Sequence, residues 1–267
     1  MALISDIRAA VKQNRPLVHC ITNPISINSC ANVILSTGAR PIMAEHPEEA
    51  ADVTRSARAV MLNLGNITDA RKQSMMISAG VASTKGKPFV LDVCGAACLV
   101  TRRKYALELI DKYPPSVVKG NYSEVVALLN EGYSSSGVDA DLALTTDTVT
   151  AAAVSLAKAL GTVILASGST DIVTDGKEVA LIHNGTPQLG TITGTGCMQG
   201  ALCAAYLSAG GAFDAAQAAC IVFGVCGQLA KTDKGAGTFG VNLLDALSTV
   251  TDEQIAKLAD AETKAAE

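Results

Sequence analysis

The sequence predicts an α/β fold in which a mostly parallel central sheet is covered by helices on both faces. Short, continuously apolar segments alternate five times with longer segments of helical periodicity. Such strands are typical of parallel sheets buried on both faces, because one-sided sheets alternate apolar and polar residues. The 267 residues are 49% apolar and 17% charged, without a linker, charge block or internal repeat. We therefore expect one domain over residues 1–267.

Five buried parallel strands are expected at the continuously apolar segments, which cover residues 17–21, 59–64, 88–93, 116–119 and 162–166. A short extended piece is expected at 41–44. A hairpin of residues 171–174 and 178–182 would add a mixed edge to the sheet. Its strands flank Asp175 and Gly176, a pair that favours a type I′ turn.

The segments between these strands carry helix signals. Pro47 marks a helix start with acidic residues in its first turn, and Gly38 is placed to end the preceding helix. The expected helices cover residues 4–11, 27–35, 47 onward, 68–82, 103–112, 123–129, 146–160, 197–208, 213–231 and 239–247. The charged, alanine-rich tail at 251–267 is expected to form a surface helix. The polar loop at 134–137 is a candidate mobile flap.

Composition and charge exclude several classes of function. The net charge of −4 gives no reason to expect nucleic acid or an anionic membrane as a partner. No apolar run approaches the ~18 residues that a membrane span needs. The eight cysteines lie mostly in apolar patterns and no secretory signal is visible, so we expect reduced thiols in a cytoplasmic protein. There is no CxxC pair and the three histidines are scattered, which argues against a zinc site.

A glycine-rich turn at residues 191–200 is the first candidate site. Gly194 and Gly196 lack a Cβ and precede an apolar helix, whose first amides have no intrahelical partner. This combination can bind an anion, and Cys197 at the helix start should have a lowered pKa. The alternative is an ordinary glycine turn above a buried helix, with Cys197 as a small core thiol. A dinucleotide fingerprint is disfavoured because the spacing is GxGxxxG and the motif lies late in the chain.

Polar residues and glycines gather where five predicted strands end. In parallel α/β sheets, ligands bind beyond these carboxyl ends. Asp92 lies in apolar surroundings and needs a metal or hydrogen-bond partner. Asn121 and Glu124 can be a helix cap, or Glu124 can join Asp92 in holding Mg²⁺ mostly through waters. The strand ends concerned are Thr22-Asn23, Gly65, Asp92, Lys119-Gly120-Asn121 and Ser167-Gly168.

Two further residues have no clear role at this point. His19 lies inside a predicted strand, where a hydrogen-bonded core histidine is the simpler interpretation. Met43 could be core or the wall of a pocket, and the sequence favours core.

Five segments together resemble the hydroxyethylthiazole kinase family of the ribokinase-like superfamily. They are LVHCITN at 17–23, PIMAE at 41–45, LNLG at 62–65, KGN at 119–121 and TGTGC at 193–197. The HCITN and PxMAE segments are the most specific, since other ribokinase-like enzymes lack them. The resemblance runs from about residue 3 to 248, and residues 237–239 and 243–245 are similar to the family's C-terminal signature.

The resemblance implies a ribokinase-like three-layer α/β/α fold and a thiamine-salvage kinase. Such an enzyme uses ATP and Mg²⁺ to phosphorylate the primary alcohol of 4-methyl-5-(2-hydroxyethyl)thiazole, and it is a homotrimer with active sites between subunits. Carried over to this sequence, Gly194, Gly196 and Cys197 would be at the substrate hydroxyl. The resemblance further implies a thiazole pocket of Asn23, Ile25, Met43, Gly65 and Gly194, ATP contacts from Lys119, Asn121 and Ser167, and metal ligands Asp92 and Glu124.

The chain departs from the family pattern at positions around the expected nucleotide. Val93 and Cys94 stand where the family usually has Pro and Val, and Ala97-Cys98 disturbs a turn of small residues. Lys119 replaces a usual Arg, which keeps the charge but loses the bidentate fork. Ser167 replaces a usual Thr and keeps the hydroxyl. These departures bear on nucleotide affinity more than on reaction type.

The hypothesis is in-line phosphoryl transfer with Cys197 as the base for the alcohol proton. Three alternatives stay open. The first is a related kinase of pyridoxine or hydroxymethylpyrimidine, and the second is an ADP-dependent hydro-lyase acting on hydrated nicotinamide cofactors. The third is a non-catalytic thiazole-binding protein.

Overall fold

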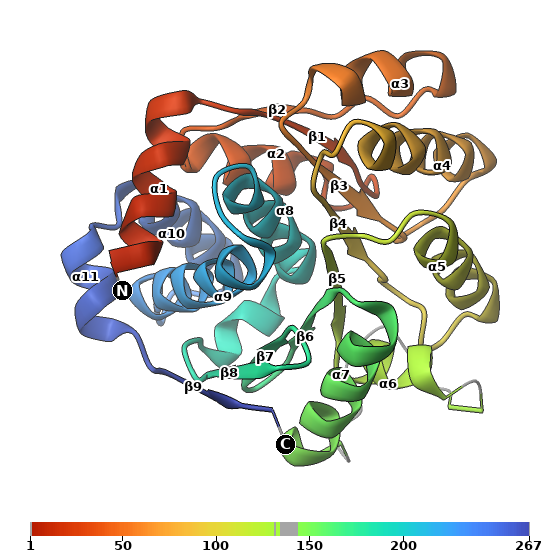
Figure 1. The fold of residues 1–267 in the computed structure, drawn as a ribbon. Helices are drawn as coiled ribbons and strands as arrows, with labels where there is room; N and C mark the ends of the chain where they lie inside the picture. The colour runs from red at the N-terminus through yellow and green to blue at the C-terminus, as the bar shows by residue number, and fades with distance from the viewer. Residues whose placement is uncertain (1, 131, 134–143, 267) are drawn as a thin grey trace.

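The computed structural model describes residues 2–130, 132–133 and 144–266, and the candidate flap at 134–137 lies outside them. Within these residues one nine-stranded sheet has the order β2-β1-β3-β4-β5-β6-β7-β8-β9 (Figure 1). The strands are β1 Leu17–Ile21, β2 Arg40–Ile42, β3 Ala59–Asn63, β4 Phe89–Asp92, β5 Val117–Asn121, β6 Val163–Ser167, β7 Asp171–Thr174, β8 Glu178–Ile182 and β9 Ala261–Ala265.

The predicted mostly parallel sheet with a mixed edge is confirmed. In the order of the sheet, neighbouring strands from β2 through β1 and β3 to β6 pair in parallel, and neighbours from β6 to β9 pair antiparallel. The register aligns the carboxyl ends of the central strands: Asn63 pairs with Asp92, and Asp92 pairs with Lys119. Asn121 pairs with Ser167 one strand further along. Polar residues on different strands are thereby brought to one edge of the sheet.

Helices cover both faces, as the ribokinase-like expectation requires. One apolar cluster lies under α1 Ala2–Asn14, α2 Ile27–Ser36, α8 Thr195–Leu207, α9 Ala212–Leu229 and α10 Ala236–Thr249. The other lies under α4 Asp69–Thr84, α5 Val100–Lys112, α6 Tyr122–Leu129 and α7 Thr146–Leu160. Three further elements complete the layers: α3 Pro47–Ser56 on α4, the 3₁₀ turn η1 Pro187–Thr191 and α11 Asp252–Leu258 on α9. Figure 1 shows the two helix groups on opposite sides of the sheet.

Alternate residues of the buried strands supply the two cores. Along β3, Met61 belongs to the cluster under α8, whereas Val60 and Leu62 belong to the cluster under α4. All three side chains are fully buried, which explains why the strand is continuously apolar.

Helix α8 is the central element of its layer, between α2 and α9 and directly on β3 and β4 (Figure 1). Every residue from Cys197 to Leu207 is buried. A Cβ added at Gly200 would lie 2.9 Å from Cε of Met61. The absence of a side chain there therefore lets α8 approach the sheet closely.

Two local expectations were wrong. The β7–β8 connection is not a type I′ turn. Such a turn needs a positive φ at both central residues, and here only Gly176 has one, of 86°, whereas Asp175 does not. Three residues lie between the two strands, and Asp175 Oδ1 accepts from the amides of Lys177 and Glu178, both at 2.8 Å. This side-chain turn replaces the backbone geometry of a two-residue hairpin.

The C-terminal tail is not one surface helix. After α11 it forms β9, an exposed strand that pairs antiparallel with β8. The ladder is extended by the bonds His183 N to Asp260 O and Ala266 N to Lys177 O. Strand β8 would otherwise present an unpaired edge, and covering it outweighs the helix preference of the alanines.

The longest helix is a core element. By length and hydropathy α9 is compatible with a membrane span, but 67% of it is buried inside the fold.

All eight cysteines are free, as expected for reduced thiols.

The close packing of α9 on the chain after β8 generates a stability prediction. A Cβ at Gly224 would lie 2.6 Å from the carbonyl oxygen of Asn184, and backbone cannot yield as a side chain does. We expect Gly224→Ala to lower the free energy of unfolding by about 1–3 kcal/mol. Gly237→Ala in α10 is the control, because nothing lies within 4 Å of its added Cβ. Denaturant unfolding checks both, and equal stability of the two variants would contradict the prediction.

Candidate functional site

The glycine-rich turn forms the N-terminus of α8, and its tip is half-buried. Gly194 is the N-cap with a φ of 87°, and the first intrahelical bond runs from Met198 N to its carbonyl oxygen. The amides of residues 195–197 come before Met198 in the helix and therefore have no intrahelical acceptor. A Cβ at Gly194 would lie 3.1 Å from Cβ of Ser26, so the turn packs on the start of α2. An N-terminus of this kind, open on one side, can bind an anion.

A buried ion pair lies directly beneath this helix tip. Nζ of Lys119 is 3.4 Å from Oδ2 of Asp92. A Cβ at Gly196 would lie 3.2 Å from that Nζ, and one at Gly200 would lie 3.3 Å from the same Oδ2. The two glycines are four residues apart and share one helix face. This bare face therefore rests on the Lys119–Asp92 pair.

Burial and charge act in opposite directions on the pair. Burial raises the pKa of Asp92 to about 7, while Lys119 opposes the rise. For Lys119, burial disfavours the charged form, but the carboxylates of Asp92 and Glu124 prevail and raise its pKa. Lys119 thus keeps its positive charge at neutral pH, under the helix tip where an anion would bind.

Cys197 lies at the centre of the site with its thiol held by polar groups. Its Sγ is 3.4 Å from Nδ2 of Asn23 and 3.3 Å from Nδ2 of Asn63. The pKa of Cys197 is lowered to about 5, first by a hydrogen bond with Cys94, against burial, and then by Lys119. The lowering thus comes from neighbouring side chains, whereas the sequence predicted it from the position of Cys197 at a helix start.

The expected thiazole residues fall into two groups. Asn23, Gly65 and Gly194 are contiguous with Cys197. Oδ1 of Asn23 accepts from the amides of Ile25 and Ser26, both at 3.1 Å, and a Cβ at Gly65 would lie 2.8 Å from Nδ2 of Asn23. Ile25 is 64% exposed, and its side chain is not enclosed by the rest of the chain.

Met43 is half-buried against the core under α8, on a segment with three anchors. Nε2 of His19 is 2.9 Å from the carbonyl oxygen of Ala44. The main-chain carbonyl oxygen of Glu45 accepts from Oγ of Ser74. The carboxylate of Glu45 forms an ion pair with Arg71, with Oε2 and Nε 2.7 Å apart. The interpretation of His19 as a hydrogen-bonded core residue is confirmed, since it fixes the backbone beside Met43.

The expected nucleotide and metal residues lie on the neighbouring strand ends. Asn121 and Glu124 form a capping box: Asn121 Oδ1 accepts from Glu124 N, and Glu124 Oε2 accepts from Asn121 N at 2.7 Å. The other oxygen of Glu124 accepts from Gly95 N at 2.7 Å. Ser167 Oγ donates to the carbonyl oxygen of Gly120 at 3.3 Å. The capping interpretation of Asn121 and Glu124 is therefore confirmed.

Asp92 and Glu124 are the carboxylates that could serve as Mg²⁺ ligands. Over the described part of the chain, no three His, Cys, Asp or Glu side chains cluster as a metal cage. Mg²⁺ usually needs only one or two carboxylates, with waters and phosphates completing its shell. Oδ1 of Asp92 is buried and has no partner among the described residues. Asp92 therefore fits, and Glu124 keeps one lone pair on each oxygen.

Sequence reasoning missed two members of the site. Asn63 lies inside the LNLG segment and is fully buried, and an amide that ends an apolar strand is a signal that the sequence offers. Cys94 was noted as a departure from the family, without its contact to Cys197. Neither contact follows from local pattern, because the partners are far apart in the sequence.

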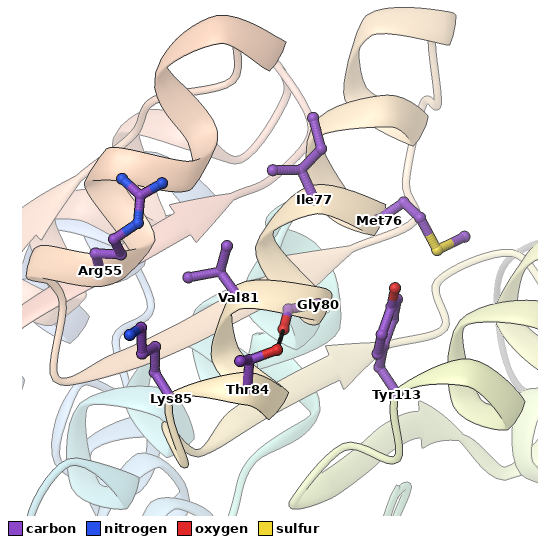
Figure 2. A pocket seen from close by; sticks show the side chains of 8 residues that line it. All are labelled: Arg55, Met76, Ile77, Gly80, Val81, Thr84, Lys85 and Tyr113. Atoms are coloured by element: carbon purple, nitrogen blue, oxygen red, sulfur yellow. Dashed lines mark hydrogen bonds between the residues drawn. The ribbon is translucent and has the colours of Figure 1, made fainter.

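A cavity of about 300 Å³ lies elsewhere, between α3, α4 and the end of α5 (Figure 2). It is lined by Arg55, Met76, Ile77, Gly80, Val81, Thr84, Lys85 and Tyr113. The C-terminal half of α4 leads back to the start of β4, so this cavity lies toward the amino ends of the strands. It is separate from the site under α8.

Comparisons with known proteins agree on one family. Residues 8–253 match the model of the hydroxyethylthiazole kinase family. Hydroxyethylthiazole kinase 2 of Clostridium botulinum (strain 657 / Type Ba4) is 40% identical, over 94% of this chain and 97% of that protein. Hydroxyethylthiazole kinase of Methanocorpusculum labreanum is 36% identical, over 97% and 98%.

A solved structure is similar over the whole chain. The hydroxyethylthiazole kinase protein from Pyrococcus horikoshii OT3 has a TM-score of 0.91 at 32% identity, covering 99% of this chain and 100% of that one. The pyridoxal kinase of Staphylococcus aureus, in complex with AMP-PCP and pyridoxal, has a TM-score of 0.61 at 14% identity, covering 94% and 99%. That second likeness is one of fold alone.

The surroundings of Cys197 predict its ionisation. Because its folded pKa of about 5 lies below the ordinary thiol value, Cys197 should be a thiolate from about pH 5 upward and a thiol below. Thiolates absorb at 240 nm, so the absorbance difference between the wild type and Cys197→Ser should rise by one thiolate across that midpoint. Cys203→Ser is the control, since burial raises the pKa of Cys203 to about 12. A difference that appears only above pH 8 would contradict the assignment.

Proposed function

Because the chain belongs to the hydroxyethylthiazole kinase family, we propose that it transfers the terminal phosphoryl group of ATP to the primary alcohol of 4-methyl-5-(2-hydroxyethyl)thiazole. The product is a phosphorylated precursor for thiamine biosynthesis and salvage. The observation that carries the proposal is the half-buried tip of α8, with Cys197 beside it and Lys119 beneath it. This arrangement is suited to a phosphoryl group that moves toward a bound alcohol.

The reaction needs charge stabilisation and one proton acceptor. In the in-line step, the alcohol oxygen bonds to the terminal phosphorus as the bond to the ADP oxygen breaks. The amides of residues 194–197 stabilise the oxygens of the moving group, and the Lys119 charge supports them from below. Sγ of Cys197 takes the alcohol proton. Because that proton leaves late in a loose transition state, a weak base suffices.

Magnesium would be held by Asp92 through its unpartnered oxygen, and by Glu124 through waters. When bound, the ion neutralises charge on the nucleotide phosphates. Glu124 also joins two loops, because it accepts from the amides of Gly95 and Asn121. By these bonds Glu124 fixes the chain after β4 and at the end of β5, which supports its proposed place beside the phosphates.

The substrates would occupy opposite sides of the helix tip. Asn23, Ile25, Met43 and Gly65 would line the thiazole, with Gly194 at its hydroxyl. Asn121 and Ser167 would contact ATP from neighbouring strand ends, which their pairing in the sheet supports. Lys119 would act on the phosphates as a charge under the helix, since its Nζ is buried against Asp92.

We propose further that the active protein is a cytoplasmic homotrimer with its sites between subunits. The exposure of Ile25, at 64%, supports this because a thiazole-contacting side chain needs a second wall. Light scattering on the purified protein tests the trimer. A mass of one subunit under assay conditions, together with full activity, would overturn it.

Two other functions use the same fold. Pyridoxal kinase of Staphylococcus aureus and the ADP/ATP-dependent NAD(P)H-hydrate dehydratase of Bacillus subtilis have TM-scores of 0.61 and 0.62, at 14% and 16% identity. Those likenesses carry fold and not substrate. The HCITN and PxMAE segments favour the thiazole, since both lie in the part of the chain around Asn23 and Met43.

An ADP-release assay separates the kinase candidates from one another and from a binding protein. With Mg-ATP we expect turnover on hydroxyethylthiazole, and at least tenfold lower kcat/KM on pyridoxine and hydroxymethylpyrimidine. A pocket shaped for one ring discriminates by roughly that factor or more. A thiazole-dependent rise in melting temperature without ADP release would instead identify a non-catalytic binding protein.

Replacement of the proposed base gives a second test. Cys197→Asp puts a carboxylate base at the same helix start, so we expect kcat to be kept or raised. Cys197→Ala removes the acceptor and should lower kcat by about a hundredfold. Loss of all activity in Cys197→Asp, with an unchanged melting temperature, would contradict the base role.

A further inference from the structure

The hydrogen bonds of the Asn63 side chain are made to three residues of the site, Asn23, Cys197 and Gly65. It is fully buried at the last residue of β3. Its Oδ1 accepts from Gly65 N at 2.8 Å and from Nδ2 of Asn23 at 3.1 Å. Its Nδ2 is 3.3 Å from Sγ of Cys197. An apolar side chain would fill this place in the core without the cost of burying an amide, so the amide needs an explanation.

Backbone donors fix the orientation of both amides at Cys197. An amide N–H can only donate, so the atom of Asn63 that meets Gly65 N must be the oxygen. The nitrogen of Asn63 therefore points to Cys197. The same argument holds for Asn23, whose oxygen accepts from the amides of Ile25 and Ser26. Neither side chain can turn over without losing a bond to the main chain.

The thiol consequently meets two donors that cannot become acceptors. A neutral thiol sulfur accepts only weakly from these two donors, whereas a sulfur carrying the negative charge accepts strongly from both, beside its hydrogen bonds with Cys94 and Ser26. Hydrogen bonds to a charged acceptor are also the stronger kind. Two side-chain amides, one in the connection after β1 and one at the end of β3, therefore converge on Sγ as a donor pair.

We propose that Asn63 is a positioning residue which, with Asn23, fixes Sγ of Cys197 as a hydrogen-bond acceptor and so keeps it ready to take the alcohol proton. Asn63 does not touch substrate in this scheme. It acts through Cys197 directly and through Asn23, whose Nδ2 it holds. The inference rests on the proposed function for the proton step alone, because the geometry of the donor pair is independent of substrate.

Other charged and titratable groups face Cys197 and set the background for the test. They come from β1, β4, the turn after β4, β5 and α6, and none of them belongs to the donor pair. Lys119 favours the thiolate, while the carboxylates disfavour it. The groups are Cys20, Asp92, Cys94, Lys119 and Glu124.

The experiment uses Asn63→Ser, whose short hydroxyl can still meet Gly65 N but cannot reach Cys197. Asn63→Leu is the second variant, because it fills the volume and has no donor. Asn184→Ser is the matched control: Asn184 is also buried and donates to Gln228 and to the carbonyl oxygen of Leu258, away from the site. Each protein is titrated by its 240 nm absorbance against the same variant carrying Cys197→Ser.

We expect both Asn63 variants to move the thiolate midpoint of Cys197 upward by about one pH unit or more. In ADP release, kcat should fall about tenfold to a hundredfold and its acidic limb should move to higher pH, with KM for the thiazole within about threefold. Asn184→Ser should lower the melting temperature without moving the midpoint or the acidic limb.

An unchanged midpoint in either folded Asn63 variant would overturn the proposal. So would failure of both variants to fold, since Asn63 would then be a structural residue. The absorbance titration needs no substrate. If the wild type released no ADP with any alcohol, the proposed function would fail while the titration still decided the role of Asn63.

Discussion

The site depends on how closely α8 lies on the ends of β4 and β5. Gly196 and Gly200 present a bare helix face to the buried pair of Lys119 and Asp92, with distances of 3.2 and 3.3 Å from the added Cβ positions. Any side chain at these positions would push the helix tip away from the charge. The exposed amides and the ammonium therefore act on the same small volume, which is why an anion and a thiolate are both favoured there.

The cost of this arrangement is a group of buried polar side chains. Lys119 and Asp92 are almost fully buried, and Asn23, Asn63 and Glu124 are buried too. Their hydrogen bonds run mainly to one another and to the main chain of neighbouring loops, which offsets much of the desolvation. The result is rigid, because each amide or carboxylate ties two segments together. A rigid donor set suits phosphoryl transfer, where positioning and preorganised charge do most of the work.

The two halves of the site differ in how firmly this chain holds their residues. The side toward α6 and β6 holds the capping box of Asn121 and Glu124 and the pairing of Asn121 with Ser167. The side toward α2 leaves Ile25 exposed, while Met43 is held on a segment anchored by His19, Ser74 and Arg71. A firmly held wall beside an open one is the geometry in which a second subunit completes a pocket, as the proposed trimer requires.

The sequence by itself determined the alternation of strands and helices, the parallel sheet, the strand ends that carry polar residues and the glycine tip with its thiol. These follow from local periodicity and from residue types that need special backbone geometry. Only the tertiary structure decided the rest. Asn63 contacts Cys197 across 134 residues, Lys119 turns inward to Asp92, and the alanine-rich tail pairs with the free edge of β8 as β9. Each of these depends on contacts between segments distant in the chain, where burial and unpaired backbone groups outweigh local preference.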